Sequence, residues 1–146
     1  MSELYLIVGL CGEKVAFRAA EVQSVIELGK ITPVPRAPAF VAGLAALRSR
    51  ALTVIDCARS LEIEQEARDL AGRQAGVVEF MGHVYALVLD AVDDVVEAQT
   101  SPEPVPARLG GGWQRVARGM VETELGPMLV VDLAAIIAGP DARKAA

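Results

Sequence analysis

The side chains that could carry covalent or acid–base chemistry are few and widely separated. The sequence has one histidine, His83, and two cysteines, Cys11 and Cys57, which lie too far apart for a redox motif or a zinc knuckle. A serine hydrolase triad would need His83 as its base. His83 instead follows Gly82 in an expected turn, where a histidine is usually solvated. We therefore expect no catalytic residue, no metal ion and no cofactor, and two reduced, buried thiols.

Two aspartates occupy similar positions in the sequence. Asp56 and Asp132 each follow a segment rich in valine and precede one rich in alanine or leucine. Two such carboxylates could act as a general acid and a general base. An aspartate directly before a helix is also a favoured N-cap, because its side chain accepts hydrogen bonds from the first free backbone N–H groups. We favour the two helix caps.

The elements that would hold these residues are short. Segments rich in valine and leucine, bounded by glycine, proline or charged residues, predict strands. The expected strands cover residues 5–10, 15–18, 22–28, 51–56, 76–81, 83–90, 92–98 and 128–132. Short helices are expected over 56–61, capped by Asp56, and over 133–138. The Pro-rich stretches 31–38 and 101–113 predict loops, and the polar segment 62–74 predicts a solvated helix or a connector.

Composition excludes several classes of function. The chain has 146 residues, of which 53% are hydrophobic, so it can bury a core and is not disordered. Its net charge of −5 excludes nucleic acid as the main partner, because phosphate binding needs clustered basic residues. No apolar run approaches the roughly 20 residues of a spanning helix, and the acidic start does not open a secretory signal. We expect a cytoplasmic protein without direct membrane insertion.

The two halves of the chain resemble each other. Residues 12–27 align with 82–97, and residues 43–61 align with 119–137. Each half has the same order: a hairpin, a third strand, a Pro-rich loop, a glycine, a strand, an aspartate and a short helix. We infer an internal duplication that forms two small antiparallel barrels packed together, since neither would bury enough surface alone.

At the level of motifs, the chain resembles the chemotaxis coupling protein family, also called the CheW-like domain, over nearly its whole length. The segments that carry the likeness are 5–10 (YLIVGL), 21–26 (EVQSVI), 31–43 (ITPVPRAPAFVAG), 46–49 (ALRS), 54–56 (VID) and 85–90 (YALVLD). The resemblance implies an all-β fold with short helices, in which two SH3-like, five-stranded β-barrel subdomains pack together. We expect one CheW-like domain over 1–146, made of two intertwined lobes of approximately 1–75 and 76–146.

The resemblance also implies a function. Proteins of this family are adaptors without enzyme activity or cofactor. They bind the cytoplasmic tip of a chemoreceptor and the regulatory domain of a CheA-type histidine kinase. We therefore expect a cytoplasmic scaffold that can be recruited to receptor arrays at the membrane. The alternatives are a divergent coupling protein of another chemosensory pathway and, in a different class, a small-ligand binder or enzyme that uses a cleft between the lobes.

Several positions depart from the family pattern. The usual Asn-Leu-Arg-Gly is Ala-Leu-Arg-Ser here, ending at Ser49, and the proline that follows is Thr53. The Leu-Arg after the aspartate is Cys57-Ala58, and the acidic residue of the third strand is Ser24. Because serine does not adopt a positive φ as easily as glycine, we expect a rearranged turn after Arg48.

The candidate partner-binding residues lie in two segments. Arg48, with Ser49, ends an otherwise apolar stretch, and arginine is enriched in the residues that dominate interface energies. The second segment is the third strand, where the candidates are Val22, Ser24, Val25 and Ile26. Strand alternation places Val22, Ser24 and Ile26 on one face. This face could line a groove for a receptor helix hairpin.

Each candidate has a structural alternative. Arg48 could instead satisfy backbone carbonyls between the two barrels, since a buried charge must be paired. The third strand could be part of the core, because valine and isoleucine are usually buried. Trp113 follows a run of glycines, and the sequence leaves open whether it is a binding contact or a lid on the core.

Overall fold

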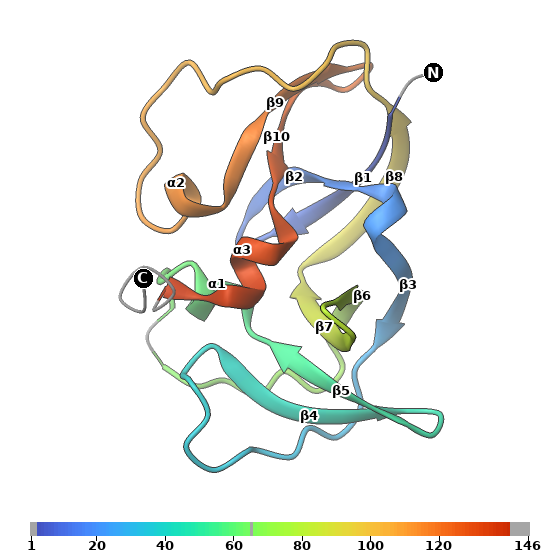
Figure 1. The fold of residues 1–146 in the computed structure, drawn as a ribbon, viewed down its shortest axis with the longest axis vertical. Coiled ribbons are helices and arrows are strands. Elements are labelled where there is room, and N and C mark those ends of the chain that lie inside the picture. Colours follow the sequence, from blue (N-terminus) through green and yellow to red (C-terminus); the bar gives the residue numbers. More distant parts are fainter. Residues whose placement is uncertain (1–2, 65, 141–146) are drawn as a thin grey trace.

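A computed structural model describes residues 3–64 and 66–140 and shows a protein built mostly of strands (Figure 1). The described residues form ten strands in two five-stranded sheets, with four short helices. The first half supplies β1 (Leu4–Leu10), β2 (Glu13–Arg18), η1 (Ala19–Glu21), β3 (Val22–Glu27), β4 (Val41–Leu47), β5 (Arg50–Ile55) and α1 (Cys57–Ser60). The second half supplies β6 (Gln74–Phe80), β7 (His83–Leu89), β8 (Ala91–Glu97), α2 (Trp113–Val116), β9 (Ala117–Thr123), β10 (Gly126–Val131) and α3 (Leu133–Ala138). The predicted all-β class is confirmed.

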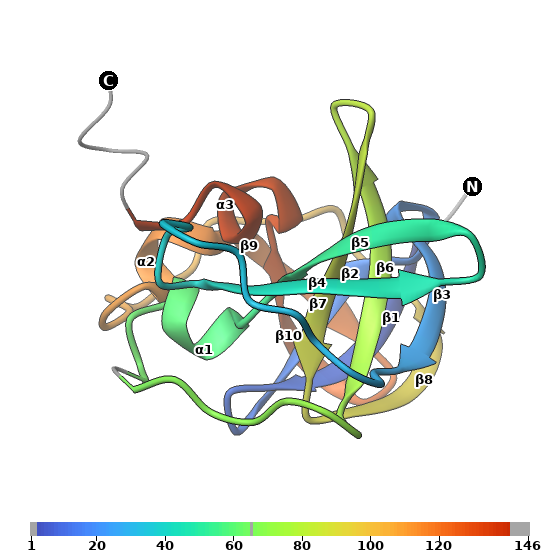
Figure 2. The same ribbon diagram turned by 90° about the horizontal axis from the view of Figure 1, so that it is seen from below.

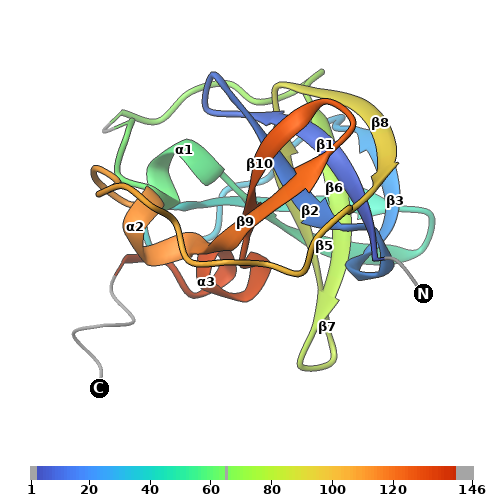
Figure 3. The same ribbon diagram turned by 90° about the horizontal axis from the view of Figure 1, so that it is seen from above.

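Each sheet takes strands from both halves of the chain. The strand order is β8-β1-β2-β10-β9 in the first sheet and β3-β6-β7-β5-β4 in the second. The two orders become identical when β1–β5 are exchanged with β6–β10, as an internal duplication requires. The third strand of each half pairs with the hairpin of the other half, β3 with β6 and β8 with β1. Figure 3 shows this interweaving from above.

Matching hairpin turns support the duplication. Cys11 and Gly12 have φ values of 52° and 83° in the β1–β2 turn, and Met81 and Gly82 have 51° and 82° in the β6–β7 turn. Positive φ at both central residues is typical of a type I′ turn, whose twist matches that of the two strands. The glycine after Cys11 and the glycine after Met81 therefore have a direct backbone reason.

A second pair of glycines allows the Pro-rich loops to approach the neighbouring strands closely. Gly43 and Gly119 have φ values of 149° and 151°. A Cβ atom at Gly43 would collide with the carbonyl of Thr32, and one at Gly119 would lie 2.9 Å from the carbonyl oxygen of Glu103. These contacts arise because each loop forms an isolated bridge with the strand beside it, at Thr32–Leu44 and Glu103–Met120.

The sequence patterns miss two equivalent strands, β4 and β9. The β4 sequence, VAGLAAL, is dominated by alanine and glycine, which have low strand propensity, and β9 follows a Gly-rich segment. The missed helix α2 lies directly before β9. In the described part of segment 62–74, which excludes residue 65, there is no helix, so the connector alternative is the right one.

Both predicted helix caps are confirmed. The Asp56 carboxylate accepts a hydrogen bond from the Arg59 N–H at 3.4 Å. The Asp132 carboxylate accepts from the N–H groups of Ala134 at 3.1 Å and Ala135 at 3.4 Å. Of the helices in the described part of the chain, none has the length and apolar character needed to span a bilayer.

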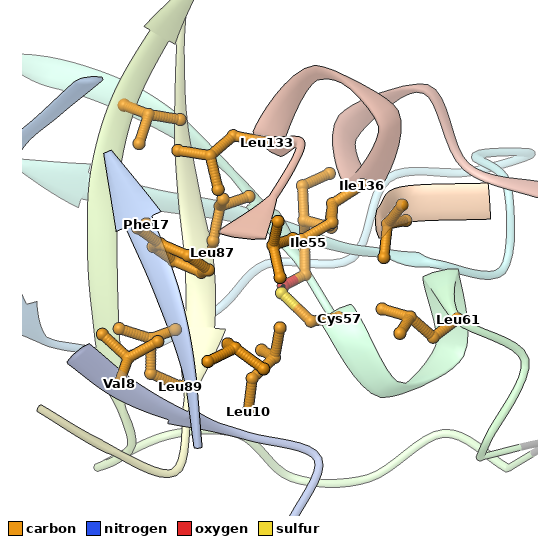
Figure 4. Close-up of a cluster of buried hydrophobic side chains, with 14 of the residues drawn as sticks. Val8, Leu10, Phe17, Ile55, Cys57, Leu61, Leu87, Leu89, Leu133 and Ile136 are labelled. Carbon is orange, nitrogen blue, oxygen red and sulfur yellow. Dashed lines mark hydrogen bonds between the residues drawn. The ribbon is translucent and has the colours of Figure 1, made fainter. Parts of the chain in front are cut away.

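The core has three parts. One cluster lies between the two sheets and takes Leu6, Val8 and Leu10 from β1 together with Leu87 and Leu89 from β7. Figure 4 labels Val8, Leu10, Leu87 and Leu89 among its members. Two further clusters each draw on one sheet, the second sheet with Leu52, Val77 and Val84 among others, and the first sheet with Tyr5 and Ile7 among others. Successive residues of β1 thus enter different clusters, which explains why this strand is apolar on both faces.

Candidate functional site

A groove at one end of the second sheet brings together all of the candidate partner-binding residues except Val22. Its volume is about 540 Å³. It is lined by Gln23, Ser24, Val25 and Ile26 of β3, by Leu47, Arg48, Ser49 and Arg50 at the β4–β5 turn, and by Leu52, Val77 and Val84. Figure 2 shows the β4–β5 hairpin reaching toward β3. Its lining combines apolar and polar side chains, which suits the binding of a protein ligand better than catalysis.

Strand pairing explains why the groove lies here. β3 and β4 are the two edges of the second sheet. The loop after β3 returns to β4, where the Thr32 N–H donates to the Leu44 carbonyl at 2.8 Å and the Leu44 N–H donates to the Thr32 carbonyl at 2.8 Å. These bonds join the loop to the middle of β4, at Leu44, and not to its end at the β4–β5 turn. The groove lies at the turn, beyond this bridge.

The corresponding region of the first sheet is joined differently. There the Gln99 N–H donates to the Glu122 carbonyl at 2.7 Å, and the Glu122 N–H donates to the Thr100 hydroxyl at 3.1 Å. In the second sheet, the equivalent of Gln99 is Gly29, whose N–H has no hydrogen bond to β4 within the described residues. The residue directly after the third strand is bonded alike in the two halves, Leu28 to the Arg73 carbonyl and Ala98 to the Glu3 carbonyl, so the difference lies one residue further on.

Val22 lies outside the groove. The pairing of β3 with β6 shifts register between Val22 and Ser24, which interrupts the expected alternation. Val22 packs against the cluster between the sheets, whereas Ile26 packs against the cluster of the second sheet. The prediction that Val22, Ser24 and Ile26 share one face is therefore wrong, and Val22 is a half-buried residue at the side of the core.

Arg48 is an exposed turn residue. It and Ser49 connect the paired residues Leu47 and Arg50. Arg48 has a φ of 59°, a left-handed conformation that costs a residue with a Cβ about 1–2 kcal/mol. The positive φ therefore falls on Arg48, the residue before Ser49. Within residues 3–64 and 66–140, Arg48 has no hydrogen bond or ion pair, so the alternative of a structural arginine is wrong for this residue.

The arginine that satisfies buried carbonyls is Arg115 on α2. Its guanidinium donates to the Ser60 carbonyl at 2.8 Å, to the Ser60 hydroxyl at 3.2 Å and to the Ala135 carbonyl. Ser60 ends α1, and its hydroxyl donates to the Ile136 carbonyl at 2.7 Å. Arg115 thus ties together α1, α2 and α3. Its sequence context gave no signal of this role, because the three helices meet only in the folded chain.

The aspartates serve structure. Asp56 is buried, and its carboxylate accepts a hydrogen bond from Arg68 at 2.8 Å in an ion pair while it caps α1. Asp132 caps α3 and occupies the equivalent place. The Asp56 N–H donates to the Phe40 carbonyl and the Asp132 N–H to the Val116 carbonyl, both at 2.8 Å. Each carboxylate is committed to a helix terminus.

The thiols are poor nucleophiles. Cys11 and Cys57 are both free, with Cys57 buried and Cys11 half-buried. Desolvation, with a smaller contribution from the negative charge of Asp90, raises the pKa of Cys11 to about 11. Burial raises the pKa of Cys57 well above its usual value. His83 is exposed at the start of β7, and the described residues contain no cluster of three or more metal-ligating side chains.

Trp113 covers part of the core. It begins α2, is half-buried and packs against the cluster between the sheets. It also borders a hollow of about 260 Å³ with Lys14, Leu109 and Leu129 among its other walls. The sequence left its role open, and the packing supports a lid on the core.

Sequence reasoning missed other lining residues of the groove. Leu47 and Arg50 flank the same turn as Arg48, so a hairpin predicted at this position would also have indicated these two residues. Val77 and Val84 carried no such signal, because they reach the groove only through the pairing of β6 with β3 and β7. Leu52 enters it from β5 in the same way.

Comparison with known proteins agrees with this architecture. The sequence model of the CheW-like domain matches residues 4–140. Among solved structures, the scaffolding protein TtCheW from Thermoanaerobacter tengcongensis is similar, with a TM-score of 0.75 and 23% sequence identity, over 90% of this chain and 89% of that chain. At this identity, the structural likeness shows the fold. No curated protein matches the sequence significantly.

Proposed function

Because the chain belongs to the CheW-like domain family, a family of non-enzymatic scaffolds, we propose that it couples a chemoreceptor to a CheA-type histidine kinase in chemotaxis-type signalling. In this role it binds the cytoplasmic tip of the receptor and the regulatory domain of the kinase. Its place of action is the cytoplasm, at receptor arrays beside the membrane.

The observation that carries the proposal is the groove between β3 and the β4–β5 turn. Two segments chosen from the sequence as partner-binding, one around Ser24 and one around Arg48, line the same cavity although they are distant in the chain. Its walls include Val25, Ile26 and Leu47, which can receive the apolar face of a helix. A receptor tip is a helical hairpin, so it can present such a face. That the kinase regulatory domain is a second partner is inferred from the family alone.

The enzyme alternative has no comparable support. A ligand cleft between the lobes would need open space between the two sheets. That region holds the apolar cluster that includes Phe17, Ile55 and Leu87, all of them buried. The two carboxylates that could have formed an acid–base pair, Asp56 and Asp132, serve as helix caps.

The departures from the family pattern bear on which pathway the chain serves. Ser24 and Ser49 both line the groove, at positions where the family usually has an acidic residue and a glycine. We propose that these changes match the chain to its own receptor, which can belong to a chemosensory pathway other than flagellar motility.

Two binary titrations test the proposal. The full chain is titrated by calorimetry with the receptor tip hairpin and, separately, with the kinase regulatory domain, both from the same organism. We expect a saturable one-to-one complex with each protein. Because the groove is the proposed receptor site, the receptor tip should broaden or shift the backbone NMR signals of β3 and the β4–β5 turn. The absence of binding to either protein would contradict the proposal.

A further inference from the structure

The charged residues that line the groove all have the same sign. They are Arg48 and Arg50, one on each side of Ser49. The other lining residues are apolar or neutral, and none is an aspartate or glutamate. A strongly acidic chain, with a net charge of −5, thus has a cationic rim beside an apolar groove.

Both guanidinium groups are available to a partner. Arg48 and Arg50 are exposed, and within the described residues neither guanidinium group has a hydrogen bond or an ion pair. Other arginines have carboxylate partners inside the chain: Arg18 contacts Glu3 at 2.8 Å, Arg68 contacts Asp56 at 2.8 Å and Arg73 contacts Asp90 at 3.1 Å. The groove thus has two guanidinium groups that no carboxylate of the described residues neutralises, although Arg36 and Arg108 are also unpaired elsewhere on the surface.

The hairpin backbone fixes the positions of the Arg48 and Arg50 Cα atoms. A two-residue turn joins the paired residues Leu47 and Arg50, and Arg48 holds a left-handed φ of 59° within it. The same left-handed φ occurs at Cys11 and Met81, the first residues of two other two-residue hairpin turns, so it belongs to the turn geometry. The Cα atoms of Arg48 and Arg50 are therefore held at the groove by a short turn, whereas their side chains remain free to adapt to a ligand.

We propose that the groove selects a helix that carries carboxylates beside its apolar face, placed so that they pair with Arg48 and Arg50. This inference rests on the proposed receptor-binding function and specifies the chemistry of the receptor helix. Arginine binds carboxylate through two parallel hydrogen bonds, which adds orientation as well as affinity. The apolar floor supplies the burial, and the rim sets which helix faces and registers are accepted.

The same charges disfavour a basic helix. Two guanidinium groups beside the groove repel lysine and arginine side chains, and like charges across an interface suppress the wrong partner. The receptor segment that enters the groove is therefore acidic at its edges.

Charge reversal in the full chain tests the inference. Arg48→Glu and Arg50→Glu each change the charge of the rim, and Arg108→Glu makes the same change of net charge at an exposed loop residue outside the groove. Binding of the receptor tip hairpin from the same organism is measured for each variant by calorimetry, at about 50 mM and about 500 mM NaCl. Thermal unfolding of every variant is recorded, so that only folded protein is compared.

We expect each rim variant to bind the tip about 30-fold more weakly than the wild type, and Arg108→Glu to bind it as tightly as the wild type. Ser24→Glu, which places a competing carboxylate in the groove, should bind the tip about 10-fold more weakly than Ser24→Gln, which adds a side chain of similar size without the charge. Acidic residues of the tip are then changed to lysine one at a time. One such tip should regain affinity for the Arg48→Glu or the Arg50→Glu chain.

Two outcomes separate this inference from the proposed function. If the wild-type chain does not bind the receptor tip, the proposed function is contradicted and the inference falls with it. If the tip binds but the rim variants bind as tightly as Arg108→Glu, or no acidic position of the tip shows rescue, the inference alone is overturned.

Discussion

Val25 on β3 and Val95 on β8 occupy equivalent positions in the two sheets, but their surroundings differ. Val25 pairs with Gly76 of β6, and Val95 pairs with Leu6 of β1, which is the equivalent strand. Both side chains are exposed, by 37% and 50%. Val25 lines the groove beside the β4–β5 turn. In the first sheet, by contrast, the segment after β8 is hydrogen-bonded to β9 through Gln99 and Glu122.

This relationship supplies a matched pair of variants. Val25→Asp places a charge in the apolar wall of the groove, where a bound helix would remove it from water, and burial of an unpaired charge is costly. We expect receptor-tip binding to weaken by about 10-fold or more. Val95→Asp should leave receptor binding unchanged. Titration of both variants with the receptor tip, at equal folded concentration, checks the prediction, and equal losses in the two would remove the groove as the receptor site.

Arg48 offers a test that separates scaffold from binding. Because its side chain is exposed and has no partner among the described residues, Arg48→Ala should melt within a few degrees of the wild type. It should bind the receptor tip about 10-fold more weakly, since it loses a charged hydrogen bond.

Arg48→Gly removes the same side chain but also relieves the left-handed φ. We expect it to be more stable than Arg48→Ala by about 1 kcal/mol, with the same weakened binding. Denaturant unfolding measures the difference in stability. A fall in melting temperature of several degrees for Arg48→Ala, with unchanged affinity per folded molecule, would make Arg48 a scaffold residue.

The sequence predicted the fold class, the duplication and both helix caps, because these depend on local patterns. Asp56 and Asp132 could be identified as caps from the strand before them and the helix after them. The alternation of β3 was misread, since the shift of register at Val22 is imposed by its pairing with β6. Strand β4 was missed because alanine and glycine weaken its local signal, and Gly43 is explained only by the close approach of Thr32.

The groove shows the same division. Ser24 and Arg48 could each be selected from the sequence, but nothing in the sequence indicated that they line the same groove. Arg115 was missed entirely, because its acceptors on Ser60 and Ala135 converge only when three helices meet. What could not be predicted is therefore what depends on contacts between distant segments.

The two capping aspartates should differ in their contribution to stability. Asp132→Ala removes a cap and should lower the free energy of unfolding by about 1 kcal/mol. Asp56→Ala also removes the partner of Arg68, and Asp56 is buried, so we expect a loss of about 2 kcal/mol or more. Chemical denaturation of the two variants provides the comparison, with Arg68→Ala as the control that keeps the carboxylate cap. A smaller loss for Asp56→Ala than for Asp132→Ala would contradict this ranking.

The raised thiol pKa values predict how stability depends on alkaline pH. In the unfolded chain Cys11 titrates near 9.0, whereas in the folded chain its pKa is about 11. Between these values the folded state keeps the proton that the unfolded state loses, so the free energy of unfolding falls as pH rises from about 9 to about 11. Below pH 9 both states are protonated and this contribution does not vary.

Cys11→Ala provides the control, because it should reduce the alkaline fall in the free energy of unfolding. Alkylation of native protein near pH 8 should also be slower at Cys11 than at a free cysteine, and slower still at the buried Cys57. Rapid native alkylation at Cys57 would show that the core around it opens easily.

The central claim is that one chain holds a receptor and a kinase together. The most direct measurement is analytical ultracentrifugation of the receptor tip and the kinase regulatory domain from the same organism, labelled with different dyes, with and without this protein. We expect both dyes to sediment in one complex that contains this chain, and Val25→Asp to remove the receptor tip from the complex while the kinase domain stays bound. Separate binary complexes with each partner, and no species that contains all three proteins, would contradict it.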